Sequence, residues 1–232
     1  GGGTSSVIYM TPQSATIDTT TLIQGFKITN GGSVGYGGGI CIIGASAKIK
    51  GNIVANNTAY YKGGGLYNSG LSLICEYSII SGNAVSQGNN SSSDGGGGIY
   101  NEGNAALFSN LKIFNNSSAD NGGGIQNYGN SCLLDNLEIN SNTTASGGGG
   151  INYNSSGFIL KNSIVTNNSA GHSGGGLSTA QGGSFINVII SNNSALDGAG
   201  IRIGGGGSFD NISITNNSAG REGGGAYCNG NV

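Results

Sequence analysis

The chain has 232 residues, of which 49 are glycine, one is proline and only 8% are charged, and its formal net charge is −2. This composition is not that of an ordinary globular domain, and a nearly neutral chain lacks the basic surface that nucleic acids and anionic membranes attract. No apolar run approaches the roughly 20 residues of a membrane-spanning helix, and no signal peptide is recognisable. The sequence therefore predicts no nucleic-acid partner and no direct membrane insertion.

Residues 1–21 show no clear repeat, so we expect an irregular segment or an incomplete first coil there. Beyond them, a glycine triplet, or Gly-Ala-Gly in one copy, precedes an apolar residue at steps of 26, 33, 26, 26, 26, 24 and 25 residues. A fixed period in this range is typical of solenoids, in which each unit buries its apolar residues against its neighbours. The equivalent residues are Ile40, Leu66, Ile99, Ile125, Ile151, Leu177, Ile201 and Ala226.

A second motif recurs in the same register, for example NLKIFNN at Asn110 and NSIVTNN at Asn162. Its fourth residue is always β-branched, and an apolar residue stands two positions before its start. Since side chains alternate between the two faces of a strand, both positions are expected to point inward. The β-branched set is Ile28, Val54, Ile80, Ile113, Ile139, Val165, Ile190 and Ile214, and the preceding set is Ile23, Ile49, Cys75, Phe108, Leu134, Leu160, Phe185 and Phe209.

These patterns predict an all-β fold, a right-handed single-stranded parallel β-helix of about eight coils with roughly 26 residues and two or three short strands each. Residues 1–232 are expected to form one domain, with a loop insertion at 86–94 that accounts for the longest step. Residues in equivalent positions of successive coils, here called a column, would then lie about 4.8 Å apart.

An asparagine ends the second motif in seven of its eight copies, with Gly31 in its place in the first. We interpret this column as a buried ladder at a tight turn, in which side-chain amides bond from coil to coil. Its members are Asn57, Asn83, Asn116, Asn142, Asn168, Asn193 and Asn217.

The few charged residues are expected to pair between coils: Lys50 with Glu76, Asp135 with Lys161, and Lys112 with Glu138. Such pairs stabilise a stack by roughly 0.2 to 1 kcal/mol each. The remaining candidates for catalysis, Asp120, Asp197, Glu222 and His172, lie on different coils and form no evident acid/base or metal-ligand cluster. The sequence therefore predicts no catalytic residue, metal or cofactor, and polysaccharide cleavage is kept only as an alternative.

The four cysteines do not suggest a disulfide framework, because Cys75 and Cys132 fall in different columns two coils apart. We expect them to serve as small apolar residues. An intermolecular bond between Cys41 and Cys228 is the alternative.

The glycine motifs GGGI (122–125), GAGI (198–201) and GGAY (224–227), with the IxxN form of Ile190–Asn193, resemble the repeats of extracellular right-handed β-helix proteins. These belong to the pectate-lyase-like superfamily and include the repeats of chlamydial polymorphic outer-membrane proteins. The resemblance implies an extracellular or cell-surface location and a structural, adhesive or carbohydrate-facing role. It implies no catalytic residue at any position of this chain.

Asn-x-Ser/Thr sequons are frequent, and five of them share the column just before the asparagine ladder. In a glycosylating secretory route they would carry a row of glycans, although a spacing of about 4.8 Å leaves little room for adjacent sugars. The candidates are Asn56, Asn89, Asn90, Asn115, Asn116, Asn142, Asn154, Asn167, Asn192, Asn211 and Asn216.

Two surfaces are candidates for contact with partners. An outward column of isoleucines, Ile53, Ile79, Ile164 and Ile189, suggests a lateral interface, unless a neighbouring loop covers it. Tyr60, Tyr61, Tyr67 and Tyr100 suggest a face on which sugars stack.

Neither end of the sequence resembles the polar cap with which solenoids close. We therefore expect either a segment of a longer protein or copies that stack head to tail as a fibre. The preferred function is a non-enzymatic extracellular fibre, stalk or surface-layer building block, with glycans attached or bound. An adhesin or passenger domain that binds carbohydrate or protein is the alternative.

Overall fold

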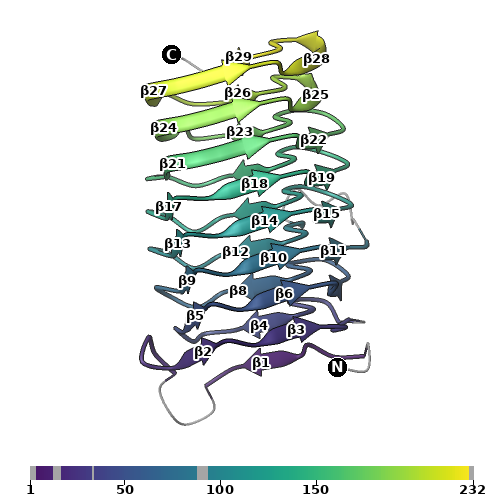
Figure 1. Cartoon of the computed structure of the whole chain (residues 1–232), viewed down its shortest axis with the longest axis vertical. Helices are drawn as coiled ribbons and strands as arrows, with labels where there is room; N and C mark the ends of the chain where they lie inside the picture. The colour runs from purple at the N-terminus through teal and green to yellow at the C-terminus, as the bar shows by residue number, and fades with distance from the viewer. Residues whose placement is uncertain (1–3, 13–16, 33, 88–93, 230–232) are drawn as a thin grey trace.

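The computed structural model describes residues 4–12, 17–32, 34–87 and 94–229, in which the chain forms 29 strands and no helix. The strands stack as a parallel β-solenoid of about eight turns, with equivalent residues about 26 positions apart. Figure 1 shows the coils piled along one axis, with the chain rising from its N-terminal to its C-terminal coil. Three parallel sheets run the length of the described rod.

Sheet A has nine strands in the described residues, and each of them except the first begins directly after the glycine motif. The first and third residues of a typical strand point into the core, and the second points outward. Its strands in spatial order are β1 (Ile8–Met10), β4 (Ile40–Ile42), β8 (Leu66–Asn68), β12 (Ile99–Asn101), β16 (Ile125–Asn127), β20 (Ile151–Tyr153), β23 (Leu177–Thr179), β26 (Ile201–Ile203) and β29 (Ala226–Cys228).

Sheet B is formed by the second motif and contributes two short strands in each of the first five coils. The first strands are β2 (Leu22–Gln24), β5 (Lys48–Lys50), β9 (Ile74–Glu76), β13 (Leu107–Ser109) and β17 (Leu133–Asp135). The second strands are β3 (Lys27–Thr29), β6 (Ile53–Ala55), β10 (Ile79–Ser81), β14 (Lys112–Phe114) and β18 (Glu138–Asn140). In the last three coils the two merge into β21 (Ile159–Thr166), β24 (Gly183–Ser191) and β27 (Gly207–Thr215).

Sheet C is the narrowest and follows the turn that holds the asparagine ladder. Its strands are β7 (Thr58–Ala59), β11 (Ala84–Val85), β15 (Ser117–Ser118), β19 (Thr143–Thr144), β22 (Ser169–Ala170), β25 (Ser194–Asp197) and β28 (Ser218–Glu222). A full coil therefore has four short strands or, where the two in sheet B merge, three. The expected two or three holds for the last three coils and is one too low for the earlier full coils, in which the two segments of sheet B are separate strands.

Between the two segments of sheet B stands the first residue of the second motif, at which φ lies between 51° and 77° in every coil. Glycine and asparagine tolerate this left-handed region best, which explains why they occupy it in seven of eight coils. The column is Gly25, Gly51, Tyr77, Asn110, Asn136, Asn162, Asn187 and Asn211.

The core consists of the columns that the repeat predicts. Ile113, Phe108 and Ile125 have no exposed surface, and their counterparts in the neighbouring coils are equally buried. In the last coil Phe209 is 45% exposed, and Ile214 is only partly buried. Each coil therefore buries its apolar residues mainly by contact with the coils on both sides.

The glycine triplet is required by close approach as well as by backbone angle. Gly122 has φ of 60°, and a Cβ on Gly124 would lie 2.5 Å from the carbonyl oxygen of Gly150 in the next coil. Since real Cβ atoms do not approach carbonyl oxygens so closely, the triplet sets the distance between coils at this bend. The strand of sheet A that follows can then start in register with its neighbours.

The N-terminal segment also contributes to the stack. β1 pairs with β4 through Ile8 and Ile40, and the first strand of sheet B begins at Leu22. At the expected insertion, residues 88–93 lie outside the described residues.

Candidate functional site

The asparagine ladder lies in the turn between sheets B and C and is buried from Asn57 to Asn193. Both the backbone N–H and the side-chain Nδ2 of Asn142 donate to Oδ1 of Asn168, at 2.9 and 3.0 Å. Nδ2 of Asn142 also donates to the carbonyl oxygen of Ile113, at 2.9 Å. The same amide-to-amide bonds recur between neighbouring coils from Asn57 to Asn217 and are charge-neutral, so the ladder binds each coil to the next without exposing a reactive group.

At the N-terminal end of this column, Gly31 donates its N–H to Oδ1 of Asn57, at 3.0 Å, but has no side chain to accept a bond. The amide-to-amide bonds all run from a donor in one coil to an acceptor in the next coil toward the C-terminus, so the ladder has one direction. The residue with a left-handed backbone in this turn is the one before the ladder, for example Asn167 at φ 56°, and not the ladder residue itself.

The sequons separate into exposed and buried positions. The five in the column before the ladder are exposed at Asn56, Asn115, Asn167, Asn192 and Asn216, and Asn211 is also exposed. Asn154 is partly buried. Asn116 and Asn142 are ladder residues with at most 1% of their surface exposed, which makes them unavailable in the folded chain, and Asn89 and Asn90 lie outside the described residues.

A second buried ladder, which we did not expect from the sequence, lies at the end of the strands of sheet A. Nδ2 of Asn68 donates to Oδ1 of Asn101, and Nδ2 of Asn101 donates to Oδ1 of Asn127, each at 2.7 Å. Each of the three also donates to the carbonyl oxygen of a glycine two residues later. The signal that could have revealed it is the recurrent Asn-x-Gly at 68–70, 101–103 and 127–129.

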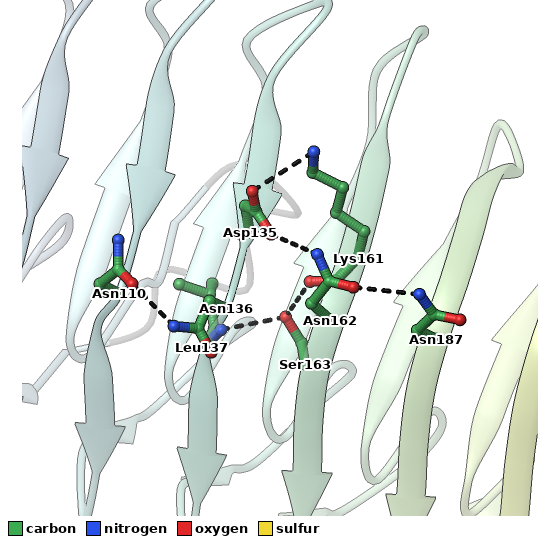
Figure 2. A network of polar contacts seen from close by, with 8 residues as sticks. All are labelled: Asn110, Asp135, Asn136, Leu137, Lys161, Asn162, Ser163 and Asn187. Carbon is green, nitrogen blue, oxygen red and sulfur yellow. Dashed lines mark hydrogen bonds and ion pairs between the residues drawn. The ribbon is translucent and has the colours of Figure 1, made fainter.

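A third row of asparagines is exposed on the outside of sheet B, in the column of positive-φ residues. Figure 2 shows Nδ2 of Asn136 donating to Oδ1 of Asn110 at 2.7 Å, and Nδ2 of Asn187 donating to Oδ1 of Asn162 at 3.1 Å. Asn162 also reaches the carboxylate of Asp135, at 2.8 Å, and Lys161 pairs with the same carboxylate at 3.3 Å. A shallow hollow of about 260 Å³ lies beside this row, against Lys112 and Glu138.

All three expected ion pairs are present, with nitrogen to oxygen distances of 3.6 Å for Lys50–Glu76, 3.3 Å for Lys161–Asp135 and 3.0 Å for Lys112–Glu138. Lys48 also pairs with Glu76, at 2.9 Å, and its hydrogen bond holds the pKa of Glu76 below the usual value. Lys62 pairs with Glu102, and Arg221 pairs with Asp197. These carboxylates too are neutralised by a cation from another coil.

The isoleucine column lies on the outer face of sheet B. Ile53, Ile164 and Ile189 are 41%, 43% and 45% exposed, and Ile79 is partly exposed. The described loops therefore leave this column largely open to solvent.

Two of the four tyrosines of the expected sugar-stacking face are buried, whereas Tyr60 and Tyr61 are partly exposed. Tyr67 and Tyr100 are 7% and 1% exposed, and their rings stack on each other at 5.7 Å between centroids. Tyr36 stacks on the other side of Tyr67, and Tyr128 packs against Tyr100. The aromatic faces that a sugar would need are thus covered by neighbouring tyrosines in this column.

Lys62 and Glu102 belong to the same tyrosine cluster on the outside of sheet A. Nζ of Lys62 is 2.8 Å from Oε1 of Glu102 and 4.7 Å from the ring centroid of Tyr100, and the Tyr67 hydroxyl donates to Glu102 at 2.7 Å. Burial would raise the pKa of Glu102, but the hydrogen bonds from Lys62 and Tyr67 outweigh it and hold that pKa below its usual value. The cluster is a packed and paired structural unit.

Three of the candidate catalytic residues lie on neighbouring coils, since the backbone N–H of Asp197 donates to the carbonyl oxygen of His172 and Asp197 pairs in register with Glu222. Asp120 is buried, and burial together with the neighbouring Asp94 raises its pKa. Asp197 pairs with Arg221, whereas Glu222 is exposed. Among the described residues, no group of three or more histidine, cysteine, aspartate or glutamate side chains is placed to hold a metal ion.

One polar hollow of about 490 Å³ lies on the outer face of sheet A toward the C-terminal coils. His172 and Asp197, which the sequence left apart, both line it, together with Arg202, Ser178 and Asn152. Its lining of hydroxyl, amide and guanidinium groups suits a polar ligand that accepts and donates hydrogen bonds.

The cysteines are all free thiols. Cys41, Cys75 and Cys132 are buried, as expected of small apolar residues, and burial raises the pKa of Cys75 to about 12. Cys228 is exposed on β29. A bond between Cys41 and Cys228 of two copies would require the buried Cys41 to become accessible.

No protein-family model, curated protein or solved structure that was compared matches this chain. Within the described residues, no helix is long and apolar enough to cross a membrane. The site must therefore be interpreted from its own geometry.

Proposed function

We propose that this chain is a non-enzymatic extracellular structural rod, the building block of a fibre, stalk or surface layer, and a distant member of the pectate-lyase-like superfamily. The observation that carries the proposal is the buried asparagine ladder, which bonds every coil from Gly31 to Asn217 to the next. The ion pairs between coils add to it. Most of the polar and charged side chains named above thus bond one coil to another, as a rod under mechanical stress requires.

Copies of the rod would meet end to end. The first coil exposes Phe26 at 57%, in a column whose next members are buried, and the last exposes Phe209 at 45%, so both end faces offer apolar surface to a second copy. At such a junction the donors of Asn217 would meet Gly31, which has no acceptor side chain. The contact between copies would accordingly be weaker than the contact between coils, and assembly would depend on concentration.

Electron microscopy of the purified chain over a concentration series tests this assembly. We expect rods that lengthen into filaments as concentration rises, and Phe209→Lys should shorten them because it places a charge in the junction. Leu71→Lys is the matched control, because it adds the same charge at an exposed apolar residue on the side of the rod, and it should leave filament length unchanged. Isolated rods of single-chain length at all concentrations would overturn the end-to-end form of the proposal.

A ligand-binding module, as in an adhesin, is the second candidate, and the polar hollow on sheet A favours it. Binding to a glycan array that is lost on Arg202→Ala and Ser178→Ala, but kept on Leu71→Ala, would support it. Leu71 is a suitable control because it is 63% exposed and does not line the hollow. An array that stays blank with the wild-type chain would count against this candidate.

A further inference from the structure

The isoleucine column continues through two charged residues and has an internal symmetry. Strand pairing places Ile53, Ile79, Lys112, Glu138, Ile164 and Ile189 one above the other on six successive coils of sheet B. The order is thus two isoleucines, a lysine, a glutamate and two isoleucines. A two-fold axis that lies in the plane of the face, perpendicular to the rod and level with the midpoint between Lys112 and Glu138, places isoleucine opposite isoleucine and lysine opposite glutamate along the column.

We propose that this face of sheet B is an interface between two copies of the chain that pack side by side with opposite rod directions. In that arrangement Lys112 of each copy faces Glu138 of the other, and Ile79 faces Ile164. Ile53 and Ile189 meet at the two ends of the contact. The interface is isologous, because each copy contributes the same residues.

The neighbouring columns of sheet B follow the same order along the rod. In the column of first strands, Ile74, Leu107, Leu133 and Ile159 are stacked on successive coils, and reversal of the rod direction opposes Ile74 to Ile159 and Leu107 to Leu133. All four are at least partly exposed, Ile159 by 38%. In the next column the same reversal opposes Glu76 to Lys161.

Charge also decides the relative direction of the two copies. If the rods were parallel, a two-fold along the rod axis would oppose Lys112 to Lys112 and Glu138 to Glu138, and like charges so close destabilise a contact. In the antiparallel arrangement each lysine faces a glutamate of the other copy. The Lys112 and Glu138 side chains are 61% and 47% exposed, and they are therefore available to a partner while they pair within one chain at 3.0 Å.

The size of the face fits a specific dimer. Six coils at about 4.8 Å span roughly 29 Å, and the eight residues of sheet B in one coil, as in β21, span about 25 Å, which gives about 700 Å² on each copy. Stable interfaces bury about 800 Å² on each partner. The hollow of about 260 Å³ lined by Lys112, Glu138 and Ile164 lies at the centre of this face and leaves space for side chains of the second copy.

A charge exchange tests the interface. Sedimentation equilibrium should show a dimer of the wild-type chain, whose dissociation constant rises at least tenfold in Lys112→Glu and in Glu138→Lys, because each variant opposes like charges across the interface. An equimolar mixture of the two variants should dimerise as tightly as the wild type, since the exchanged charges then face opposite charges. The double variant Lys112→Glu/Glu138→Lys should also dimerise with itself.

Apolar controls separate this contact from a general effect of charge. Ile164→Asp should weaken the dimer at least tenfold, whereas Leu71→Asp, an equally drastic change of an exposed residue elsewhere, should not. A wild-type chain that stays monomeric, or a mixture of the two charge variants that fails to regain the dimer, would overturn the proposal. Tighter pairing of Lys112→Glu with the wild-type chain than of wild type with itself would also overturn it, in favour of parallel rods. These variants leave the end coils unchanged, so this result is independent of filament growth.

Discussion

At the scale of the residue, the two asparagines of each turn have opposite roles although they are adjacent in sequence. Asn167 adopts a positive φ and is exposed, whereas Asn168 is buried and bonds to the coils on both sides. Asparagine suits the first position because it tolerates a left-handed backbone conformation. It suits the second because its side-chain amide donates and accepts hydrogen bonds at the same time. Sequence repetition alone shows that both positions matter but not which property each one supplies.

Replacement of the two asparagines distinguishes these roles. Asn168→Ala leaves the donors of Asn142 and the carbonyl oxygen of Ile139 without partners, so we expect it to lower the free energy of unfolding by about 3 kcal/mol or more. Asn167→Gly keeps the backbone conformation and should change it by less than about 0.5 kcal/mol. Urea denaturation followed by circular dichroism measures both, and equal costs would contradict the ladder's role.

Asp120 gives the chain a pH-dependent stability. Burial and the neighbouring Asp94 raise its pKa in the folded chain above the ordinary value of 3.8, so the folded state binds the proton more tightly than the unfolded state. The stability associated with this group is present below pH 3.8 and is lost as pH rises through the raised pKa. Asp120→Asn, which cannot ionise, should therefore gain stability relative to the wild type as pH increases from about 4 to about 8.

Denaturation series at several pH values measure this difference. Asp210→Asn is the control because Asp210 is exposed. A difference between Asp120→Asn and the wild type that stays constant over the whole range would show that Asp120 does not carry the dependence.

At the scale of the element, the glycine triplet and the strand after it act as one unit. The first glycine supplies a positive φ, and the third lies too close to the next coil for any side chain. Much of this was predictable, because the period and the inward columns followed from repeated glycine and β-branched residues. The division of sheet B into two short strands was not expected, although the sequence carries its signal: Phe108 and Ile113 both point inward but are five residues apart, an odd spacing that one alternating strand does not allow.

The close approach at the triplet predicts a position-specific cost for alanine. Gly124→Ala would place Cβ 2.5 Å from the carbonyl oxygen of Gly150, so the coils must separate, and we expect a loss of about 3 kcal/mol of unfolding free energy. Gly206→Ala is the matched control because a Cβ at this position would meet no atom within 4 Å, and it should change stability by less than about 1 kcal/mol. Chemical denaturation of the two variants provides the comparison, and similar midpoints would argue against a steric role of the triplet.

The candidate sites were less predictable than the fold. The sequence placed Lys112 next to Glu138, and three ion pairs followed correctly, because pairing between coils depends only on the repeat. It did not show that Tyr67 and Tyr100 cover each other, since ring packing depends on how side chains turn within a column. Nor did it bring His172 and Asp197 to one hollow, because His172 stands two residues before its glycine triplet whereas Asp197 stands one residue before the Gly-Ala-Gly of its coil.

At the scale of the whole molecule, the rod sets the spacing of anything attached to it. Asn167, Asn192 and Asn216 lie on three successive coils, whereas Gly82 and Ser141 separate Asn56 and Asn115 from the other sequons of the column. Neighbouring coils are about 4.8 Å apart, which is less than the width of a sugar. Crowding should accordingly affect the first group and not the second.

Expression through a glycosylating secretory pathway tests this expectation. We expect high occupancy at Asn56 and Asn115 and the lowest occupancy at Asn192, which has a sequon on each side. Asn116 and Asn142 should carry no glycan in the folded product because they are buried. Mass spectrometry of glycopeptides gives site occupancy, and uniform occupancy along the column would refute the crowding argument.

The coil that contains residues 86–94 is seven residues longer than most, yet Ala84 still pairs with Ser117 and Ile99 still pairs with Leu66. The register of all three sheets is thus insensitive to the length of the connection between sheet C and the glycine triplet. In engineering terms this connection is a natural grafting point. Peptides inserted there on chosen coils would be displayed along one edge of the rod. The distances between them would be multiples of the spacing between neighbouring strands.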